Sequence, residues 1–391
     1  MANHDEKRTK QEAQEPQGKK GLSSRLPKLL ILLLVVLAVV VLTTMEDGTS
    51  FAALRRWLMY GDSGNSGNCY TYTADSGNRY GQLGGDLLLV NGNSIQLLRD
   101  DGTALYDLQV SLKSPSLSVG NNAAAVCDVG GGTVYLLDKS GVYREMTASG
   151  NLCYYSARLN GKNYLAVTEQ KTGYKASVAV YNNEGEKLFG FDSHDSYISD
   201  ALVTEDCKYV VAVSLDPRSG VFGSTLLVYD LAQAQQVGEY PIRDGLVMEL
   251  VNTGGRLISL CDTRLSIISL EGETLLDHSY GNLYLHGYAL TGGDFCALLL
   301  GRYQAGNVCQ LSTFDLDGEL VASLEVTEEV LDLSAAGEYL AVLYSDSLVI
   351  YTRDLQEYAR LEGTDYAGRT IMGEDGTALV LAGSSAWRYL P

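Results

Sequence analysis

Between residues 69 and 391, short apolar segments of strand length alternate with turns rich in Gly, Asn and Asp. The clearest unit is GEYLAVL at 337–343 followed by SLVIY at 347–351, which predicts two neighbouring strands of one sheet. No helical period of useful length interrupts the pattern. The first strand of the unit recurs at residues 86–90, 123–126, 164–167, 209–213, 256–260, 294–298, 339–342 and 377–380.

The spacing of these copies predicts the architecture. Their first residues are 37 to 47 positions apart, close to the roughly 40 to 50 residues that a four-stranded propeller blade occupies. We therefore expect an all-β fold, a β-propeller of eight four-stranded blades. Seven blades would follow if the copy near Ala123 were an insertion.

The last copy ends with a strand at residues 385–389 and is one strand short of a full blade. Residues 69–73 (CYTYT) alternate like a strand and precede the first full copy. Pairing this segment with the last copy closes the ring and removes an exposed sheet edge. We expect it to complete the last blade.

The chain begins with a different pattern. Residues 1–25 are polar, charged and aperiodic, which predicts a disordered basic tail. Residues 26–45 are apolar apart from Lys28 and two threonines, and a helix of this length spans about 30 Å, the thickness of one bilayer core. The pattern predicts a transmembrane helix acting as an uncleaved signal anchor. A signal peptide cleaved near Ser50 is the alternative.

Charge predicts how this helix crosses the bilayer. Basic residues between Lys19 and Lys28 crowd one end of the span, whereas Glu46 and Asp47 open the other. By the positive-inside rule the N-terminus lies in the cytoplasm and the large domain is extracytoplasmic, at the cell membrane. Residues 46–68 then form a short juxtamembrane helix and a Gly/Ser/Asn linker, and residues 69–391 form the propeller domain.

Composition narrows the classes of partner. With 46% hydrophobic residues the chain can bury a large core. The formal charge of −19 is uneven, because residues 1–45 hold seven Lys/Arg and four Asp/Glu, so residues 46–391 carry about −22. Such a field repels phosphate backbones, which argues against nucleic-acid binding. Its commonest meaning is a soluble, solvated surface, and a polar or cationic partner is the alternative.

The repeat resembles blades of the β-propeller superfamily, in particular WD40-like and quinoprotein-like repeats. A basic tail, one apolar span and an acidic propeller rich in Tyr and Gly are together similar to an uncharacterised family of single-pass membrane-anchored propellers of Gram-positive anaerobes. The resemblance implies fold and location and names no activity. Trp57 and Trp387 are the only tryptophans, so the Trp-Asp signatures of WD40 blades and the docking repeats of quinoprotein enzymes are missing. We expect no cofactor.

Candidate catalytic residues are few. His194 and Asp195, and likewise Asp277 and His278, are adjacent pairs in which a carboxylate can orient an imidazole as a general base or metal ligand. Both pairs are expected in loops just before the first strand of a blade, on one face of the ring. No Ser or Cys nucleophile motif accompanies them.

No metal site is predicted either. The segment Asp315-Leu316-Asp317-Gly318 begins like a calcium loop, but it lacks the third ligand position and the closing glutamate. Its offset within the repeat instead predicts a hairpin turn with glycine at the left-handed position.

Seven cysteines show neither CxxC pairs nor zinc-ligand spacing. Cys127, Cys207, Cys261 and Cys296 lie in or beside the equivalent inner strand of four blades, which predicts buried thiols. If one disulfide forms, Cys296 and Cys309 are the preferred pair because they are expected in adjacent strands.

These observations favour a binding or scaffolding module that engages a protein, peptide or glycan at the cell envelope through loops on one face, while the span at 26–45 contacts the lipid bilayer. The alternative is an extracytoplasmic hydrolase or lyase whose site, in the central channel, contains His194, Asp195, Asp277 and His278. A sensor that signals through the single helix is a third hypothesis.

Overall fold

The computed structural model describes residues 69–391 apart from residues 100, 151, 219–220 and 243–244. The predicted tail (1–25), transmembrane helix (26–45) and juxtamembrane segment (46–68) lie outside the described residues. Within the part that is described, no helix is long and apolar enough to cross a bilayer.

The described residues form 32 strands in eight four-stranded antiparallel sheets. Blades 1 to 4 consist of β2 (Arg79–Leu83), β3 (Asp86–Val90), β4 (Ser94–Leu98), β5 (Ala104–Gln109); β6 (Pro115–Val119), β7 (Ala124–Asp128), β8 (Thr133–Asp138), β9 (Gly141–Thr147); β10 (Tyr154–Leu159), β11 (Leu165–Glu169), β12 (Ala176–Tyr181), β13 (Lys187–Ser193); and β14 (Tyr197–Val203), β15 (Tyr209–Arg218), β16 (Val221–Asp230), β17 (Gln235–Ile242). Blades 5 to 8 consist of β18 (Val247–Thr253), β19 (Arg256–Cys261), β20 (Arg264–Ser269), β21 (Thr274–Ser279); β22 (Tyr284–Ala289), β23 (Phe295–Gly301), β24 (Cys309–Asp315), β25 (Leu320–Val326); β26 (Val330–Ala336), β27 (Tyr339–Tyr344), β28 (Ser347–Thr352), β29 (Glu357–Glu362); and β30 (Ala367–Met372), β31 (Ala378–Ala382), β32 (Ser385–Tyr389), β1 (Cys69–Thr71).

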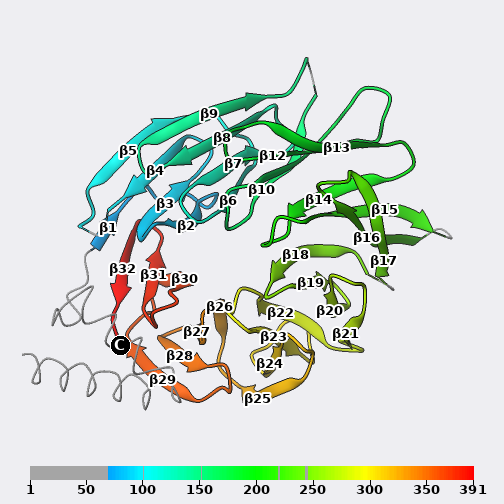
Figure 1. Cartoon of the computed structure of the whole chain (residues 1–391). Coiled ribbons are helices and arrows are strands. Elements are labelled where there is room, and N and C mark those ends of the chain that lie inside the picture. The colour runs from blue at the N-terminus through cyan, green and yellow to red at the C-terminus, as the bar shows by residue number, and fades with distance from the viewer. Residues whose placement is uncertain (1–68, 100, 151, 219–220, 243–244) are drawn as a thin grey trace, which may run out of the picture. The chain divides into compact units, whose positions relative to one another are not determined.

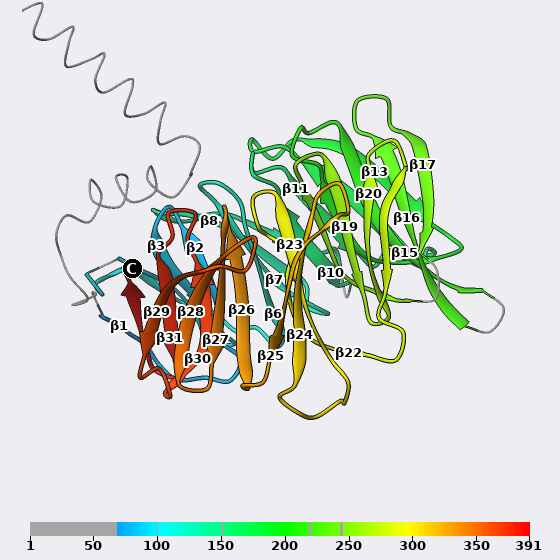
Figure 2. The same cartoon turned by 90° about the horizontal axis from the view of Figure 1, so that it is seen from below.

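The blades follow one another around a ring, so the predicted eight-bladed propeller is confirmed and seven blades are excluded. Figure 1 looks down the ring, with the first strand of each blade nearest the centre and the fourth strand at the periphery. In Figure 2 the strands run between the two faces of the ring. Because neighbouring strands are antiparallel, the segments that lead into first strands share one face with the turns between second and third strands. We call this the entry face.

The hydrophobic core consists of layers between neighbouring blades. In β27, Leu340 and Val342 belong to one buried cluster with Phe295 and Leu299 of blade 6. Similar clusters join the other blades from 1 to 6 in succession, and blade 8 to blade 1. Middle strands such as β7 and β27 are buried on both faces, which explains why they appear in the sequence as continuous apolar runs.

The predicted closure of the ring is confirmed. β1 pairs with β32 in antiparallel register, Cys69 opposite Trp387 and Thr71 opposite Ser385. The hydroxyl of Tyr72 donates to the carbonyls of Ala382 and Ser385 at 2.7 and 2.9 Å. The N-terminal strand thereby covers the edge that blade 8 would otherwise expose.

A β-bulge recurs in the first strand of six of the eight blades. Each bulge adds one residue that has no partner on the second strand, and it changes the direction of the side chains on either side. The sequence pattern did not predict this feature. The extra residues are Tyr155, Ser199, Met248, His286, Leu331 and Gly368.

The predicted hairpin turn at Asp315 is confirmed. The Asp315 carboxylate accepts hydrogen bonds from the backbone N–H groups of Asp317 and Glu319, at 3.0 and 2.8 Å. Gly318 has φ +90°, and a Cβ there would lie 2.6 Å from the carbonyl oxygen of Leu275. Glycine is therefore required for both conformation and space.

The six cysteines whose side chains are described all carry free thiols. Cys127, Cys261 and Cys296 are buried as predicted, whereas Cys207 is half-buried, in the turn between β14 and β15. Cys296 and Cys309 do lie in adjacent strands, but Cys296 is opposite Phe314 and Cys309 is opposite Gly301. Their side chains also belong to different inter-blade clusters, so the preferred disulfide pair is wrong.

Ring closure can be tested at Tyr70, whose side chain is fully buried between blades 8 and 1. We expect Tyr70→Ala to lower the free energy of unfolding by about 3–5 kcal/mol, because a large aromatic side chain leaves the layer that joins first and last blades. Tyr143→Ala, at a 41% exposed residue of β9, should cost at most about 0.5 kcal/mol. Urea denaturation followed by circular dichroism measures both, and equal losses would contradict this account of closure.

Candidate functional site

The four predicted site residues lie in two unlike places. His194 and Asp195 are in the connection between β13 and β14, on the entry face, as predicted. The His194 ring packs on Tyr174 with centroids 4.2 Å apart, and the Asp195 carbonyl accepts a 2.6 Å hydrogen bond from Lys175. This loop is fixed by aromatic and backbone contacts.

Asp277 and His278 lie in β21, the outermost strand of blade 5, and not in a loop. Asp277 accepts two hydrogen bonds from Arg264, at 2.7 and 2.8 Å. The His278 ring packs on Phe314, and burial lowers the pKa of its imidazole. The structure therefore does not bring the two histidines together. Across the described residues, no three His, Cys, Asp or Glu side chains are grouped as a metal site requires.

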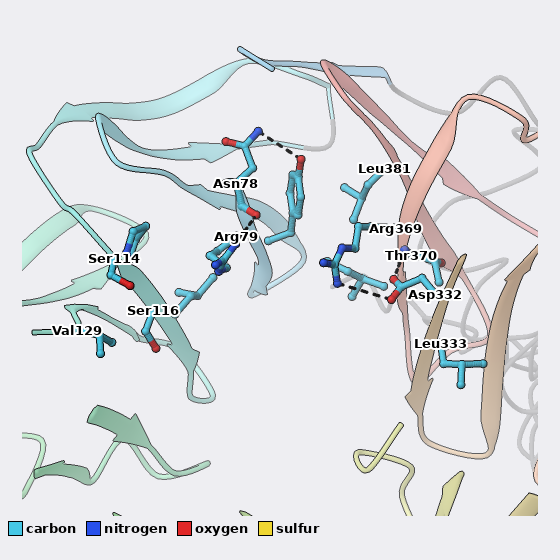
Figure 3. A pocket seen from close by; sticks show the side chains of 14 residues that line it. Asn78, Arg79, Ser114, Ser116, Val129, Asp332, Leu333, Arg369, Thr370 and Leu381 are labelled. Atoms are coloured by element: carbon cyan, nitrogen blue, oxygen red, sulfur yellow. Dashed lines mark hydrogen bonds and ion pairs between the residues drawn. The ribbon is translucent and has the colours of Figure 1, made fainter. Parts of the chain in front are cut away.

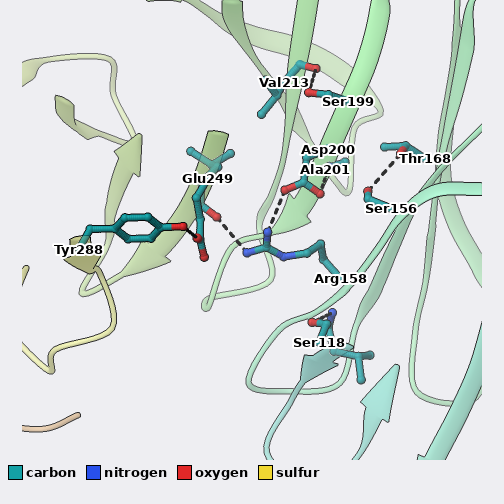
Figure 4. A network of polar contacts seen from close by, with 12 residues as sticks. Ser118, Ser156, Arg158, Thr168, Ser199, Asp200, Ala201, Val213, Glu249 and Tyr288 are labelled. Carbon is teal, nitrogen blue, oxygen red and sulfur yellow. Dashed lines mark hydrogen bonds and ion pairs between the residues drawn. The ribbon is translucent and has the colours of Figure 1, made fainter. Parts of the chain in front are cut away.

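Polar side chains of the first strands instead form a network in the central channel (Figure 4). Arg158 of β10 donates 2.9 Å hydrogen bonds to the Asp200 carboxylate of β14 and to the backbone carbonyl of Leu250 in β18. The hydroxyl of Tyr288 in β22 donates to Glu249 of β18 at 2.9 Å. Four consecutive blades thus contribute to one chain of contacts.

Burial sets the charge states within this network. Desolvation raises the pKa of Asp200, and the guanidinium of Arg158 opposes that shift. Desolvation and the Glu249 carboxylate raise the pKa of Tyr288 to about 12. The phenol of Tyr288 therefore stays neutral at physiological pH and acts as a hydrogen-bond donor. On this side of the channel, each charge has a partner of matching chemistry.

The opposite side of the channel contains a cavity of about 710 Å³, bounded by the first strands of blades 1, 2, 7 and 8 (Figure 3). Arg79 of β2 and Arg369 of β30 both project into it. Asp332 of β26 accepts a 2.8 Å hydrogen bond from the backbone N–H of Thr370 and lies 3.8 Å from the Arg369 guanidinium. A second cavity, of about 460 Å³, shares Asp332 and Arg369 and is also lined by His286 and Tyr288.

Apolar side chains gather on the entry face, where blades 4 to 8 begin. Met248 and Leu331 are bulge residues, 53% and 40% exposed. His286, another bulge residue, shares a 2.8 Å hydrogen bond with the backbone carbonyl of Tyr303 and ties the β23–β24 connection to this face. The members, which we call the rim surface, are between 39% and 72% exposed: Tyr197, Leu246, Met248, Leu283, Tyr284, Tyr303, Val308, Leu331 and Tyr366.

Sequence reasoning missed both the channel groups and the rim surface. A signal was nevertheless present, since charged residues precede the inner strand of several copies by six to nine positions. Arg79, Arg158, Asp200, Glu249, Asp332 and Arg369 all occupy such positions. A charged residue that recurs at this position indicates that the strand before the buried one has a face exposed to water.

Comparisons with known proteins agree with this fold. The model of a family of unknown function (DUF5711) matches residues 66–367, and the chain belongs to that family. No curated protein matches it.

Several solved structures are similar to the chain. BamB from Moraxella catarrhalis has a TM-score of 0.51 and 11% sequence identity, covering 80% of this chain and 96% of BamB. A eukaryotic initiation factor has a TM-score of 0.54 and 10% sequence identity, covering 81% of this chain and 89% of the initiation factor. The dihydro-heme d1 dehydrogenase NirN has a TM-score of 0.52 and 14% sequence identity, covering 75% of this chain and 67% of NirN. At these identities the likeness shows the propeller fold alone.

The channel network yields a pH-dependent prediction. Arg158→Ala should lower the free energy of unfolding by about 2 kcal/mol at pH 7, because the largely buried Asp200 carboxylate loses its counter-charge. Since the pKa of Asp200 is already raised, its ionised form costs stability above that pKa and protonation removes the cost. The deficit should therefore shrink as the pH falls through the raised pKa.

A second substitution provides the control. Arg158→Ala/Asp200→Asn should be more stable at pH 7 than Arg158→Ala alone, because no uncompensated charge remains. Thermal unfolding from pH 4 to pH 8 measures both differences. A deficit in Arg158→Ala that does not vary with pH would rule out this electrostatic role.

Proposed function

We propose that this member of the DUF5711 family is a membrane-anchored, extracytoplasmic binding module that docks a protein partner on its rim surface. The observation that carries the proposal is the concentration of exposed apolar and aromatic side chains on one face of five consecutive blades. Exposed apolar and aromatic side chains that gather on one face are typical of protein interaction sites.

The way in which the rim surface is built supports this function. Met248 and Leu331 are the unpaired residues of bulges in strands that are otherwise paired along their length, and both side chains are exposed. Side chains carried on a rigid sheet lose little conformational entropy when a partner binds. Aliphatic Leu, Met and Val side chains make up much of the surface, which favours a protein or peptide over a glycan.

The location of the module is part of the proposal. The uncharged apolar segment within residues 26–45 and the basic residues before it are consistent with an N-terminus in the cytoplasm and a propeller outside. The charge of about −22 on residues 46–391 disfavours docking onto anionic lipid headgroups. The partner is therefore expected to be an envelope protein with an apolar centre and basic flanks.

The docking surface can be tested by capture. Full-length protein, solubilised from membranes after chemical cross-linking in intact cells, is purified and its partners are identified by mass spectrometry. Met248→Asp/Leu331→Asp should remove the specific partner, because each change places a charge in an apolar interface. Val237→Asp/Leu320→Asp alters residues of the outer strands with similar exposure and should leave capture unchanged.

Equal capture by both double variants, or no partner that distinguishes them from the unmodified chain, would reject docking on the rim surface.

Topology has its own test. Ser149→Cys, at an exposed site in the propeller, should react with a membrane-impermeant maleimide in intact cells, above the background of the unmodified chain. Ser23→Cys, in the predicted cytoplasmic tail, should react only after permeabilisation. The reverse labelling pattern would place the propeller in the cytoplasm.

A further inference from the structure

We propose that the channel holds a binding site for a carboxylate carried beside an apolar group, with Arg79 and Arg369 as the residues that bind the carboxylate. The site lies in the cavity of about 710 Å³ between blades 1, 2, 7 and 8. It goes beyond protein docking on the rim surface and stands on separate residues.

The two arginines occupy matching positions on the innermost strands of blades that are neighbours in the closed ring. Arg79 is the first residue of β2, and Arg369 follows the bulge of β30. Both guanidinium groups enter the same cavity in Figure 3. Two planar guanidinium groups in one cavity can donate hydrogen bonds to the two oxygens of a carboxylate.

Neither guanidinium is strongly engaged by the described residues. Arg79 donates only long hydrogen bonds, of 3.3 and 3.4 Å, to the carbonyls of Gly77 and Asn78 beside it in the chain. Arg369 approaches the Asp332 carboxylate at 3.8 Å, beyond hydrogen-bonding distance. Arg158, by comparison, makes two bonds of 2.9 Å. Donor capacity is therefore left for a ligand on the side of Arg79 and Arg369.

The charges in the cavity select the kind of anion. Arg79, Arg369 and Asp332 together carry a net charge of about +1 when all are ionised. A singly charged carboxylate balances this charge. A doubly charged phosphate would leave an excess negative charge next to Asp332, inside a domain that is already strongly acidic.

The remaining wall selects what the carboxylate is attached to. The half-buried Leu117, Leu333 and Ile371 and the exposed Val129 line the same cavity as the arginines, beside polar residues such as Ser116. Its volume also falls within the roughly 300 to 1,000 Å³ typical of ligand pockets. The ligand class is therefore an amphipathic monocarboxylate, either a small organic acid or an acidic residue flanked by apolar ones in a peptide.

Isothermal titration calorimetry on the full-length protein in nanodiscs tests the site with matched probes. The small-acid probe is 3-phenylpropionate, compared with its neutral amide. The peptide probe is acetyl-Leu-Glu-Phe-amide, compared with acetyl-Leu-Gln-Phe-amide. Whichever acid binds more tightly identifies the source of the carboxylate, and its neutral analogue should bind at least about tenfold more weakly.

The protein variants locate the binding. Arg79→Gln and Arg369→Gln should each weaken the acid by about tenfold, because each removes charge-assisted hydrogen bonds, and the double variant should abolish binding. Arg99→Gln, at an exposed residue after β4, removes the same charge and should have no effect. Met248→Asp on the rim surface should also leave the affinity unchanged, which separates this site from the proposed docking function.

Three results would overturn the proposal: no binding of either acid at millimolar concentration, equal affinity for an acid and its neutral analogue, or affinity unaffected by Arg79→Gln and Arg369→Gln. Circular dichroism and thermal midpoints verify that each variant is folded. If the double variant does not fold, the two single variants decide, together with Arg79→Lys and Arg369→Lys, which keep the charge but not the fork and should bind with intermediate affinity.

Discussion

The pairing of β1 with β32 is the interaction on which the rest of the structure depends. Each inter-blade layer needs a blade on both sides, and the first strand of the domain, by joining the last sheet, adds Tyr70 to the layer between blades 8 and 1. Arg388 of β32 adds a hydrogen bond of 2.9 Å to the carbonyl of Gly85 in blade 1. β1 becomes the outermost strand of the last sheet, so the outer edge of β32 is paired and the ring is closed.

A closed ring also determines where polar groups can lie. Second and third strands are largely buried on both faces, so a charged side chain there leaves water and needs a partner inside, as Arg388 of β32 has in the carbonyl of Gly85. First strands have only one face against the core, and their other face lines the channel. This explains why Arg158, Asp200, Glu249 and Asp332 all belong to first strands. The two sides of the channel differ in chemistry: polar side chains are paired on the side of blades 3 to 6, and two weakly engaged arginines lie in a cavity of mixed polar and apolar lining on the other.

The features that the sequence predicted well are those that burial dictates. Continuous apolar runs such as LLLV in β3 predicted the inner strands, alternation in CYTYT predicted the closing strand, and the position of Gly318 within the repeat predicted a turn. These patterns repeat because every blade solves the same packing problem.

The wrong predictions concern positions that packing constrains less. Asp277 and His278 were expected in a loop, because a fourth strand with one face exposed to solvent has only a weak apolar pattern. The Cys296–Cys309 pair failed because adjacency of two strands does not fix register, and register decides which residues are opposite. The bulges were missed for a related reason, since one extra residue in a strand hardly alters the apolar pattern.

The recurrent bulge connects these observations. First strands pack one face into the inter-blade layers, with residues such as Leu250, whereas the extra residues Met248 and Leu331 lie outside the buried clusters of their own strands. Met248 and Leu331 are exposed at the entry-face ends of their strands, and Asp332 and Arg369, which directly follow a bulge, line the channel cavities. One backbone irregularity thus supplies side chains to two surfaces without altering the core. Substitutions of exposed bulge residues such as Met248 and Leu331 can therefore change what the propeller binds with little effect on its stability, which depends on the buried strands and on the β1–β32 pairing.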